Sequence, residues 1–162
     1  MEPCRLCIIR HGETDWNVER RIQGHIDVPL NAAGWAQAAA VAKGLIGQRF
    51  AAAYSSDLQC AWQTAQTVVL PDIAVQVAPG LRERHYGVLQ GLTAAEILLR
   101  LPEIHARYVA RDIHYDFDGG ESLTAFAARV VAAVEALAAC HPGENLLLVA
   151  HGGVLDVCYR QA

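Results

Sequence analysis

The run Leu146-Leu147-Leu148-Val149 restricts the fold of this sequence more than any other feature. Four consecutive apolar residues leave no side of a strand for water, so such a strand has to be covered on both faces. The run stops at Ala150-His151-Gly152-Gly153, where polar and small residues take over. This pattern is typical of the central strand of a parallel sheet that lies between two layers of helices.

Strand patterns alternate with helical patterns along the rest of the chain. Further strands are expected over 4–10, 51–55 and 73–77. Helices are expected from Asn31 to about Ile46, from Ser56 or Asp57 to about Leu70, from the capping box Thr93-x-x-Glu96 to about Leu101, from Pro102, from about 122 to Cys140, and after His151. The polar stretches 11–30, 79–92 and 112–121 are expected to be loops. We therefore predict an α/β three-layer sandwich in one domain, 1–162, with a mostly parallel sheet and helices on both faces.

Composition excludes several classes of protein. The chain has 162 residues, 53% of them hydrophobic, and a formal net charge of -4. A basic excess, as in nucleic-acid or anionic-membrane binders, is missing, so neither partner is expected. The sequence has no apolar run long enough for a membrane span and no signal-peptide pattern, which favours the cytoplasm.

Five cysteines are spread without the spacing of a disulfide framework, and we expect reduced thiols. Cys4 and Cys7 form a C-x-x-C pair, but positions i and i+3 of a strand point to opposite faces. The pair is therefore interpreted as two small buried residues, and no metal site is predicted.

Polar residues follow each predicted strand. Arg10-His11-Gly12 follows the first, Ser56-Asp57 the second, Arg82-Glu83-Arg84 the third and His151-Gly152-Gly153 the last. In a parallel sheet these four segments share the carboxyl edge, where ligands of open α/β sheets bind. We expect the functional site there.

His11 is the first candidate at this edge. A single histidine after a buried strand is more often a polar strand-end residue with a satisfied hydrogen bond than a catalytic residue. A second strand-end histidine, His151, favours the catalytic interpretation of His11. Two imidazoles, the forked cation Arg10 and a nearby carboxylate form the outline of a phosphoryl-transfer site.

The chain resembles the histidine phosphatases, also called the phosphoglycerate-mutase-like superfamily. The resemblance rests on segments that agree in order and spacing over essentially the whole chain. They are Arg10-His11-Gly12-Glu13-Thr14, Asp15-Trp16-Asn17, Gln23-Gly24, Pro29-Leu30-Asn31 with Gly34, Ser55-Ser56-Asp57-Leu58 with Gln63-Thr64-Ala65, Leu81 to Gly87, Gly120-Glu121-Ser122 and Val149 to Gly153.

This resemblance implies a role for each matching residue. His11 would attack phosphorus to form a phosphohistidine, Arg10 and His151 would hold the phosphoryl oxygens, and Glu83 would be the general acid and base. Further phosphate contacts would come from Asn17, Gln23, Gly24 and Gly152. The expected partner is a small phosphate ester, and neither a metal nor another cofactor is implied.

Cys60 is the main departure from the family pattern. The usual motif reads S-D-L-x-R-A-x-Q-T-A, and Cys60 stands where its arginine would be. A thiol cannot replace a bidentate cation, and loss of one such donor lowers rates by roughly 10²–10³. A position near a helix N-terminus and beside cations would allow Cys60 to form a thiolate, and that charge would repel phosphate. A weakened phosphatase, a non-catalytic phosphate-binding protein and an ordinary enzyme with a substituted or mis-sequenced position all remain open.

Length is the second departure. Family members usually continue for tens of residues past the second His-Gly-Gly, whereas this sequence stops at Ala162. An edge strand and part of the cleft wall are therefore expected to be absent. An uncovered sheet edge favours self-association, so a homodimer is an alternative to a monomer.

The stretch Glu83-Arg84-His85-Tyr86-Gly87 resembles the phosphoglycerate mutases in particular, which makes Arg84 and Tyr86 candidates for substrate binding. Mutases carry an insertion after this stretch that helps to close the site, and only 88–119 lie there in this chain. A mutase has to keep water from the phosphohistidine, so a shorter lid favours hydrolysis. The sequence therefore predicts a phosphatase, with a mutase as the alternative.

Overall fold

The computed structural model describes residues 2–69 and 71–161. The strands are β1 (Arg5–Arg10), β2 (Ala52–Ser55), β3 (Val75–Val77) and β4 (Asn145–Ala150). The helices are α1 (Asp15–Glu19), α2 (Ala32–Gly44), α3 (Gln59–Val68), α4 (Ala94–Arg100), α5 (Pro102–Val109), α6 (Leu123–Ala139) and α7 (Gly152–Gln161).

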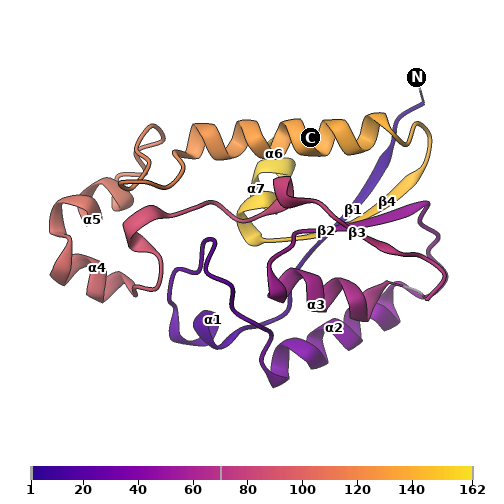
Figure 1. Cartoon of the computed structure of the whole chain (residues 1–162), viewed down its shortest axis with the longest axis horizontal. Coiled ribbons are helices and arrows are strands. Elements are labelled where there is room, and N and C mark those ends of the chain that lie inside the picture. Colours follow the sequence, from indigo (N-terminus) through magenta and orange to yellow (C-terminus); the bar gives the residue numbers. More distant parts are fainter. Residues whose placement is uncertain (1, 70, 162) are drawn as a thin grey trace.

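The four strands form one sheet in the order β1-β4-β2-β3. All three pairings are parallel, with Ile8 beside Leu148 and Tyr54 on the other side of Leu148. Helices α6 and α7 cover one face of this sheet and α2 and α3 cover the other, while α4 and α5 lie beyond its carboxyl edge (Figure 1). The predicted α/β three-layer architecture is confirmed.

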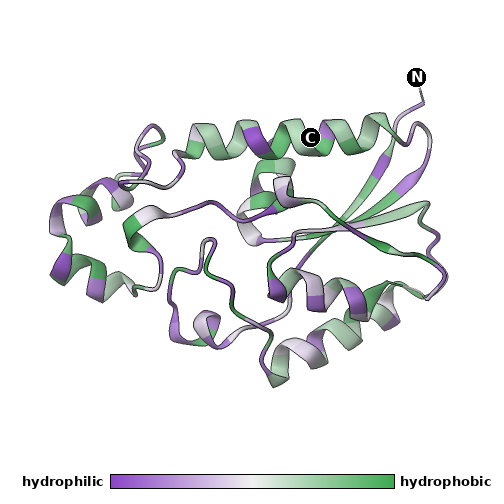
Figure 2. Cartoon of the chain, viewed as in Figure 1, coloured by the Kyte–Doolittle hydropathy of each residue, from purple (hydrophilic) through white to green (hydrophobic). Residues whose placement is uncertain are grey.

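β4 is the central strand that its sequence predicts. Leu146 and Leu148 pack into the cluster under α6 and α7, and Leu147 and Val149 pack into the cluster under α2 and α3. Each of the four side chains is at most 1% exposed. The strands and α6 are mostly hydrophobic, whereas much of the long segment after β1 is hydrophilic (Figure 2).

Cys4 and Cys7 contact these two different clusters, Cys4 on the α6 side and Cys7 on the α2 side. Their predicted separation by the sheet is therefore confirmed. All five cysteines are free thiols within the described part of the chain.

Two of the predicted helix starts are present as expected. Asn31 caps α2 through a hydrogen bond from the amide of Gly34, and Thr93 and Glu96 form a full capping box on α4. These side chains are paired within four residues of sequence, which is why a local pattern predicts them.

The predicted start of α3 is wrong. Its N-cap is Leu58, without a side-chain cap, because Ser56 contacts His151 and Asp57 pairs with Arg82. Asp27, from the loop after β1, instead accepts a hydrogen bond of 2.7 Å from the amide of Gln59. The predicted end of this helix, at about Leu70, lies outside the described residues.

Two predicted loops contain short helices. α1 lies within 11–30, and two single 3-10 turns, Pro79–Leu81 and Gly87–Leu89, lie within 79–92. Thr14 and Asn17 form a capping box on α1. It was not predicted, because the acidic and polar composition of this stretch indicated a loop. Within the described ranges, the structure contains no helix that is both long and apolar enough to cross a membrane.

Candidate active site

His11 follows the last residue of β1. Its backbone amide donates to the carbonyl of Ala150 on β4, and its ring Nδ1 donates to the carbonyl of Gly12 at 2.6 Å. Because Nδ1 carries the proton, Nε2 keeps a free lone pair. Burial lowers the pKa of His11; the hydrogen bond to Gly12 opposes this shift, and nearby Arg10 adds to it.

Gly12 is required by packing. A Cβ at this position would lie 2.4 Å from the backbone oxygen of Gly34 at the start of α2. The Gly12 amide also donates to Oγ1 of Thr64 at 3.0 Å, which ties the His11 turn to α3. Only a residue without a side chain permits this close approach of two backbones.

His151 lies at the end of β4, beside His11. The two ring centroids are 5.1 Å apart, and Nε2 of His151 contacts Oγ of Ser56 at 2.9 Å. Burial, and then the neighbouring His11, lower the pKa of His151 well below its ordinary value. Both imidazoles are therefore neutral near pH 7, as a nucleophile and a neutral hydrogen-bonding group have to be.

Glu83 comes from the loop after β3. Its Oε1 accepts from the amide of Arg84 at 2.8 Å, and its Oε2 accepts from the amide of Gly153 at 3.0 Å. Burial raises the pKa of this carboxyl, while the two amides act in the opposite direction. A carboxyl group with a raised pKa is suited to give and take a proton.

Arg129 on α6 holds the Glu83 loop in place. Its guanidinium donates to the backbone oxygens of Gly80, Arg82 and Glu83 and forms an ion pair with Glu121 at 2.7 Å. His25 also donates to the Glu83 carbonyl, at 2.7 Å. Arg129 belongs to no motif and lies in an Ala/Val-rich helix, so the sequence does not predict its role.

Asn17 and Gln23 are both oriented by Thr14. The Thr14 amide donates to Oδ1 of Asn17 at 3.0 Å, and the Thr14 hydroxyl donates to Oε1 of Gln23. Both side-chain oxygens are therefore occupied, and only the amide NH₂ groups remain to donate. Thr14 is fully buried, and its central place was not predicted.

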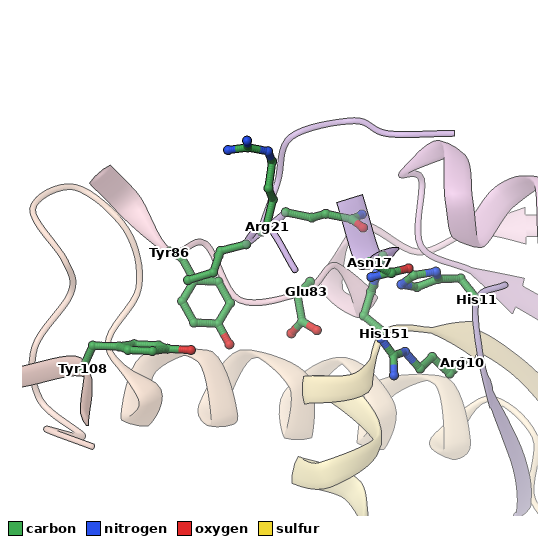
Figure 3. A pocket seen from close by; sticks show the side chains of 11 residues that line it. Arg10, His11, Asn17, Arg21, Glu83, Tyr86, Tyr108 and His151 are labelled. Atoms are coloured by element: carbon green, nitrogen blue, oxygen red, sulfur yellow. The ribbon is translucent and has the colours of Figure 1, made fainter. Parts of the chain in front are cut away.

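His11, His151, Glu83, Asn17 and Gln23 all line one cavity of about 170 Å³. Its walls include most of the predicted residues, namely Arg10, His11, Asn17, Gln23, Gly24, Glu83, Tyr86 and His151. His11, His151, Asn17 and Arg10 gather at one end, Tyr86 and Tyr108 at the other, and Glu83 lies between the two groups (Figure 3).

Three unpredicted residues, Arg21, Ile22 and Tyr108, also line this cavity. Tyr108 reaches it from α5, which the loops 79–92 and 112–121 bring beside the site. The sequence around Tyr108 contains no signal that would predict this position.

Arg84 lies elsewhere. Its side chain is buried beside the rings of Tyr86 and Phe117, and it donates to the carbonyls of Glu121 at 2.8 Å and Tyr115 at 3.1 Å. The residues around the 170 Å³ cavity do not include Arg84. They do not include Gly152 either, where a Cβ would lie 3.6 Å from Nε of Arg10. In this conformation Arg84 stabilises the loop rather than contacting the cavity.

Cys60 lies in the first turn of α3, 2% exposed, with its Sγ near both histidines. Burial raises the pKa of this thiol to about 12, and the nearby carboxylates of Asp27 and Glu83 act in the same direction. The thiol form is therefore favoured over the thiolate that a helix N-terminus would allow, because loss of solvation raises the pKa of Cys60. A neutral thiol does not repel phosphate, but it provides no cation.

Together these residues can surround a tetrahedral anion. Neutral imidazoles, amide NH₂ groups and Arg10 face one end of the cavity, and a protonatable carboxyl lies beside them. Such an arrangement can hold a phosphoryl group, place an imidazole nitrogen against phosphorus and protonate a leaving oxygen.

Comparison with known proteins agrees with this chemistry. The family model of the histidine phosphatase superfamily (branch 1) matches residues 6–162, and the chain belongs to this superfamily. It is 40% identical to phosphoglycerate mutase-like protein 4 of Arabidopsis thaliana, over 97% of this chain and 70% of that protein. It is also 40% identical to the metal-independent phosphoserine phosphatase of the same plant, over 98% of this chain and 68% of that protein.

The solved structure of a mycobacterial glucosyl-3-phosphoglycerate phosphatase superposes with a TM-score of 0.84 at 37% identity. The match covers 95% of this chain and 79% of that one. The superfamily thus includes relatives named as phosphatases and relatives named after the mutase.

Proposed function

We propose that this protein hydrolyses a small phosphate monoester through a phosphohistidine on Nε2 of His11. The observation that carries the proposal is the hydrogen bond from His11 Nδ1 to the Gly12 carbonyl, which leaves Nε2 free and unprotonated. The superfamily and its phosphatase-named relatives support this class of reaction.

The reaction has two steps. Nε2 of His11 forms a bond to phosphorus while the ester oxygen leaves and takes the proton of Glu83. The Glu83 carboxylate then takes a proton from water as that water attacks the phosphohistidine and frees His11. Arg10, His151 and the NH₂ groups of Asn17 and Gln23 donate to the phosphoryl oxygens in both steps.

Hydrolysis rather than isomerisation is favoured by the position of Arg84. A mutase has to bind the carboxylate of a phosphoglycerate while excluding water. Arg84 is the cation that the resemblance to mutases suggests for this carboxylate. Its guanidinium already donates to two backbone carbonyls and packs against two aromatic rings. Mutase activity remains the second candidate, since one relative at 40% identity is named after it.

The test is to trap the intermediate and to follow its fate. Incubation with a ³²P-labelled ester should give acid-labile protein phosphate, which His11→Ala abolishes and the exposed control His114→Ala retains. The rate of p-nitrophenyl phosphate hydrolysis should fall about 10³-fold or more in His11→Ala. With 3-phosphoglycerate, faster formation of 2-phosphoglycerate than of phosphate would overturn hydrolysis in favour of the mutase. Binding without any labelling would instead indicate a non-catalytic phosphate-binding protein.

A further inference from the structure

Three potential metal ligands meet inside the candidate active site. The Sγ of Cys60 and one ring nitrogen from each of His11 and His151 all lie within 4.8 Å of one another. Thiolate and imidazole are the ligands that Zn²⁺ prefers in proteins. We propose that these residues form an inhibitory site for Zn²⁺, in which the ion occupies the nitrogen of His11 that attacks phosphorus.

The spacing requires only a small adjustment of side chains. Tetrahedral Zn²⁺ with bonds of about 2.3 Å to sulfur and about 2.0–2.1 Å to nitrogen places its ligand atoms roughly 3.3–3.6 Å apart. The most widely spaced pair of these atoms, at up to 4.8 Å, therefore has to close by roughly 1.2–1.5 Å, a shift that the two side chains share. They come from the end of β1, the first turn of α3 and the end of β4, and the sheet and its helices hold these backbones in place.

Each imidazole is already held by a hydrogen bond through its other ring nitrogen, His11 to a backbone carbonyl and His151 to a hydroxyl. His11 Nδ1 donates to the Gly12 carbonyl at 2.6 Å, which aims Nε2 into the cavity. The ring of His151 is held by Ser56 Oγ at 2.9 Å. These contacts hold the orientation of both rings, so less ordering is needed when an ion binds, and the Ser56 hydroxyl, which can donate or accept, permits the tautomer of His151 that binds a metal.

Ion binding would change the state of Cys60. Burial raises the pKa of its thiol to about 12, so the thiol of the metal-free protein carries its proton and is a poor nucleophile. On binding, the S–H bond breaks, an S–Zn bond forms and the proton leaves to solvent, with no change of oxidation state. The carboxylates of Asp27 and Glu83 lie close enough to Cys60 to raise its pKa, and their charge favours a cation there, whereas Arg10 opposes it.

Cys60 is what makes the site possible. Where related proteins have an arginine in this motif, the guanidinium has no lone pair to donate and its charge repels a metal ion. Three protein ligands leave a fourth position on the ion for water or for an oxygen of inorganic phosphate. The inhibitory part of this inference rests on the proposed function, whereas the binding part does not.

Binding is tested with Co²⁺, which replaces Zn²⁺ and reports thiolate ligands by a charge-transfer absorption in the near ultraviolet. Metal-free protein should show this absorption with one Co²⁺ per chain and lose it when Zn²⁺ is added. Cys60→Ser should abolish the absorption, and the exposed control Cys140→Ser should retain it. Thermal unfolding of each variant checks that the fold is intact.

Inhibition is tested separately, with each variant compared with its own rate in excess chelator. Zn²⁺ should stop p-nitrophenyl phosphate hydrolysis by the parent protein, and chelator should restore it. The Zn²⁺ concentration for half inhibition should rise at least tenfold in Cys60→Ser and not change in Cys140→Ser.

Each contrary result would overturn a different part of the proposal. Absence of the thiolate absorption from the parent protein, or its persistence in Cys60→Ser, would overturn the metal site. Faster hydrolysis with Zn²⁺ would overturn the inhibitory role. Normal Co²⁺ binding by a protein that hydrolyses nothing in chelator would overturn the proposed function and the inhibition, and would support the binding alone.

Discussion

The carboxylate of Glu83 accepts a hydrogen bond of 3.0 Å from the backbone amide of Gly153, seventy residues further along the chain. This contact joins the loop after β3 to the first turn of α7, directly beside His151. The general acid is thus oriented by the same turn that carries the second histidine. The second glycine of His151-Gly152-Gly153 thus positions Glu83 although it does not line the cavity.

Replacing Gly153 should displace Glu83. A Cβ at this position would lie 2.2 Å from Oε1 of Glu83, so Gly153→Ala has to push the carboxylate aside. We expect the turnover of alkyl phosphates to fall by about 10²-fold, the usual contribution of a general acid. Turnover of p-nitrophenyl phosphate should fall less, because its leaving group needs no proton. Gly44→Ala, whose Cβ would meet nothing, is the control, and equal losses for both substrates would contradict the prediction.

The pH dependence of the first step should reflect the raised pKa of Glu83. The carboxyl has to be protonated to give a proton to the leaving group, so phosphohistidine formation from an alkyl ester should fall on the alkaline side at a pH above the ordinary carboxyl value of 4.5, whereas protonation of His11 limits it on the acid side. Glu83→Gln should be slow and should lose this alkaline fall. Single-turnover labelling between pH 4 and 9 measures the rate of phosphohistidine formation. An alkaline fall of this rate centred at or below pH 4.5 would refute the raised pKa of Glu83.

The same raised pKa has a consequence for stability. A group that binds its proton more tightly in the folded state stabilises the fold below its unfolded pKa, and this contribution is lost as pH rises through the folded pKa. The Tm of Glu83→Gln relative to the parent protein should therefore increase as pH rises from 4.5. Glu135→Gln, on an exposed part of α6, controls for the removal of one charge. A Tm difference that stays constant with pH would count against a buried carboxylate.

Thr14 should act through the two amides that it orients. Thr14→Val removes the hydroxyl that donates to Gln23 and accepts from the amide of Asn17. The NH₂ of Gln23 is then free to rotate away, so kcat/KM should fall about tenfold and inhibition by inorganic phosphate should weaken. Thr14→Ser keeps the hydroxyl and should restore both values. Equal effects of Val and Ser would indicate a purely structural role.

Restoring a cation at position 60 should raise activity. Cys60 lies beside His11 and His151, where a guanidinium could donate to the phosphoryl oxygens. Cys60→Arg should increase p-nitrophenyl phosphate turnover tenfold or more and should prevent inhibition by Zn²⁺. Cys60→Met, which is long but uncharged, should not increase turnover. An unchanged rate in Cys60→Arg would show that the phosphate does not lie against α3.

Sequence patterns predicted the architecture well where the structure depends on residues that are close together in the chain. The apolar run of β4 required cover on both faces, and the caps at Asn31 and Thr93 bind amides only three residues away. The start of α3 failed for the opposite reason. Ser56 and Asp57 are good cap residues, but His151 and Arg82, which are distant in sequence, bind them instead.

The sequence by itself determined the layers of this protein and the edge of the sheet where its chemistry lies. An uninterrupted apolar run decides which strand is central, and parallel strands bring Arg10-His11, Glu83 and His151 to one edge. Tertiary structure alone decided how these residues are tuned. Burial sets the protonation of His11, Glu83 and Cys60, and contacts across many residues orient Glu83, Gln23 and His151. Desolvation and long-range hydrogen bonds depend on the whole packed chain, so no short stretch of sequence contains them.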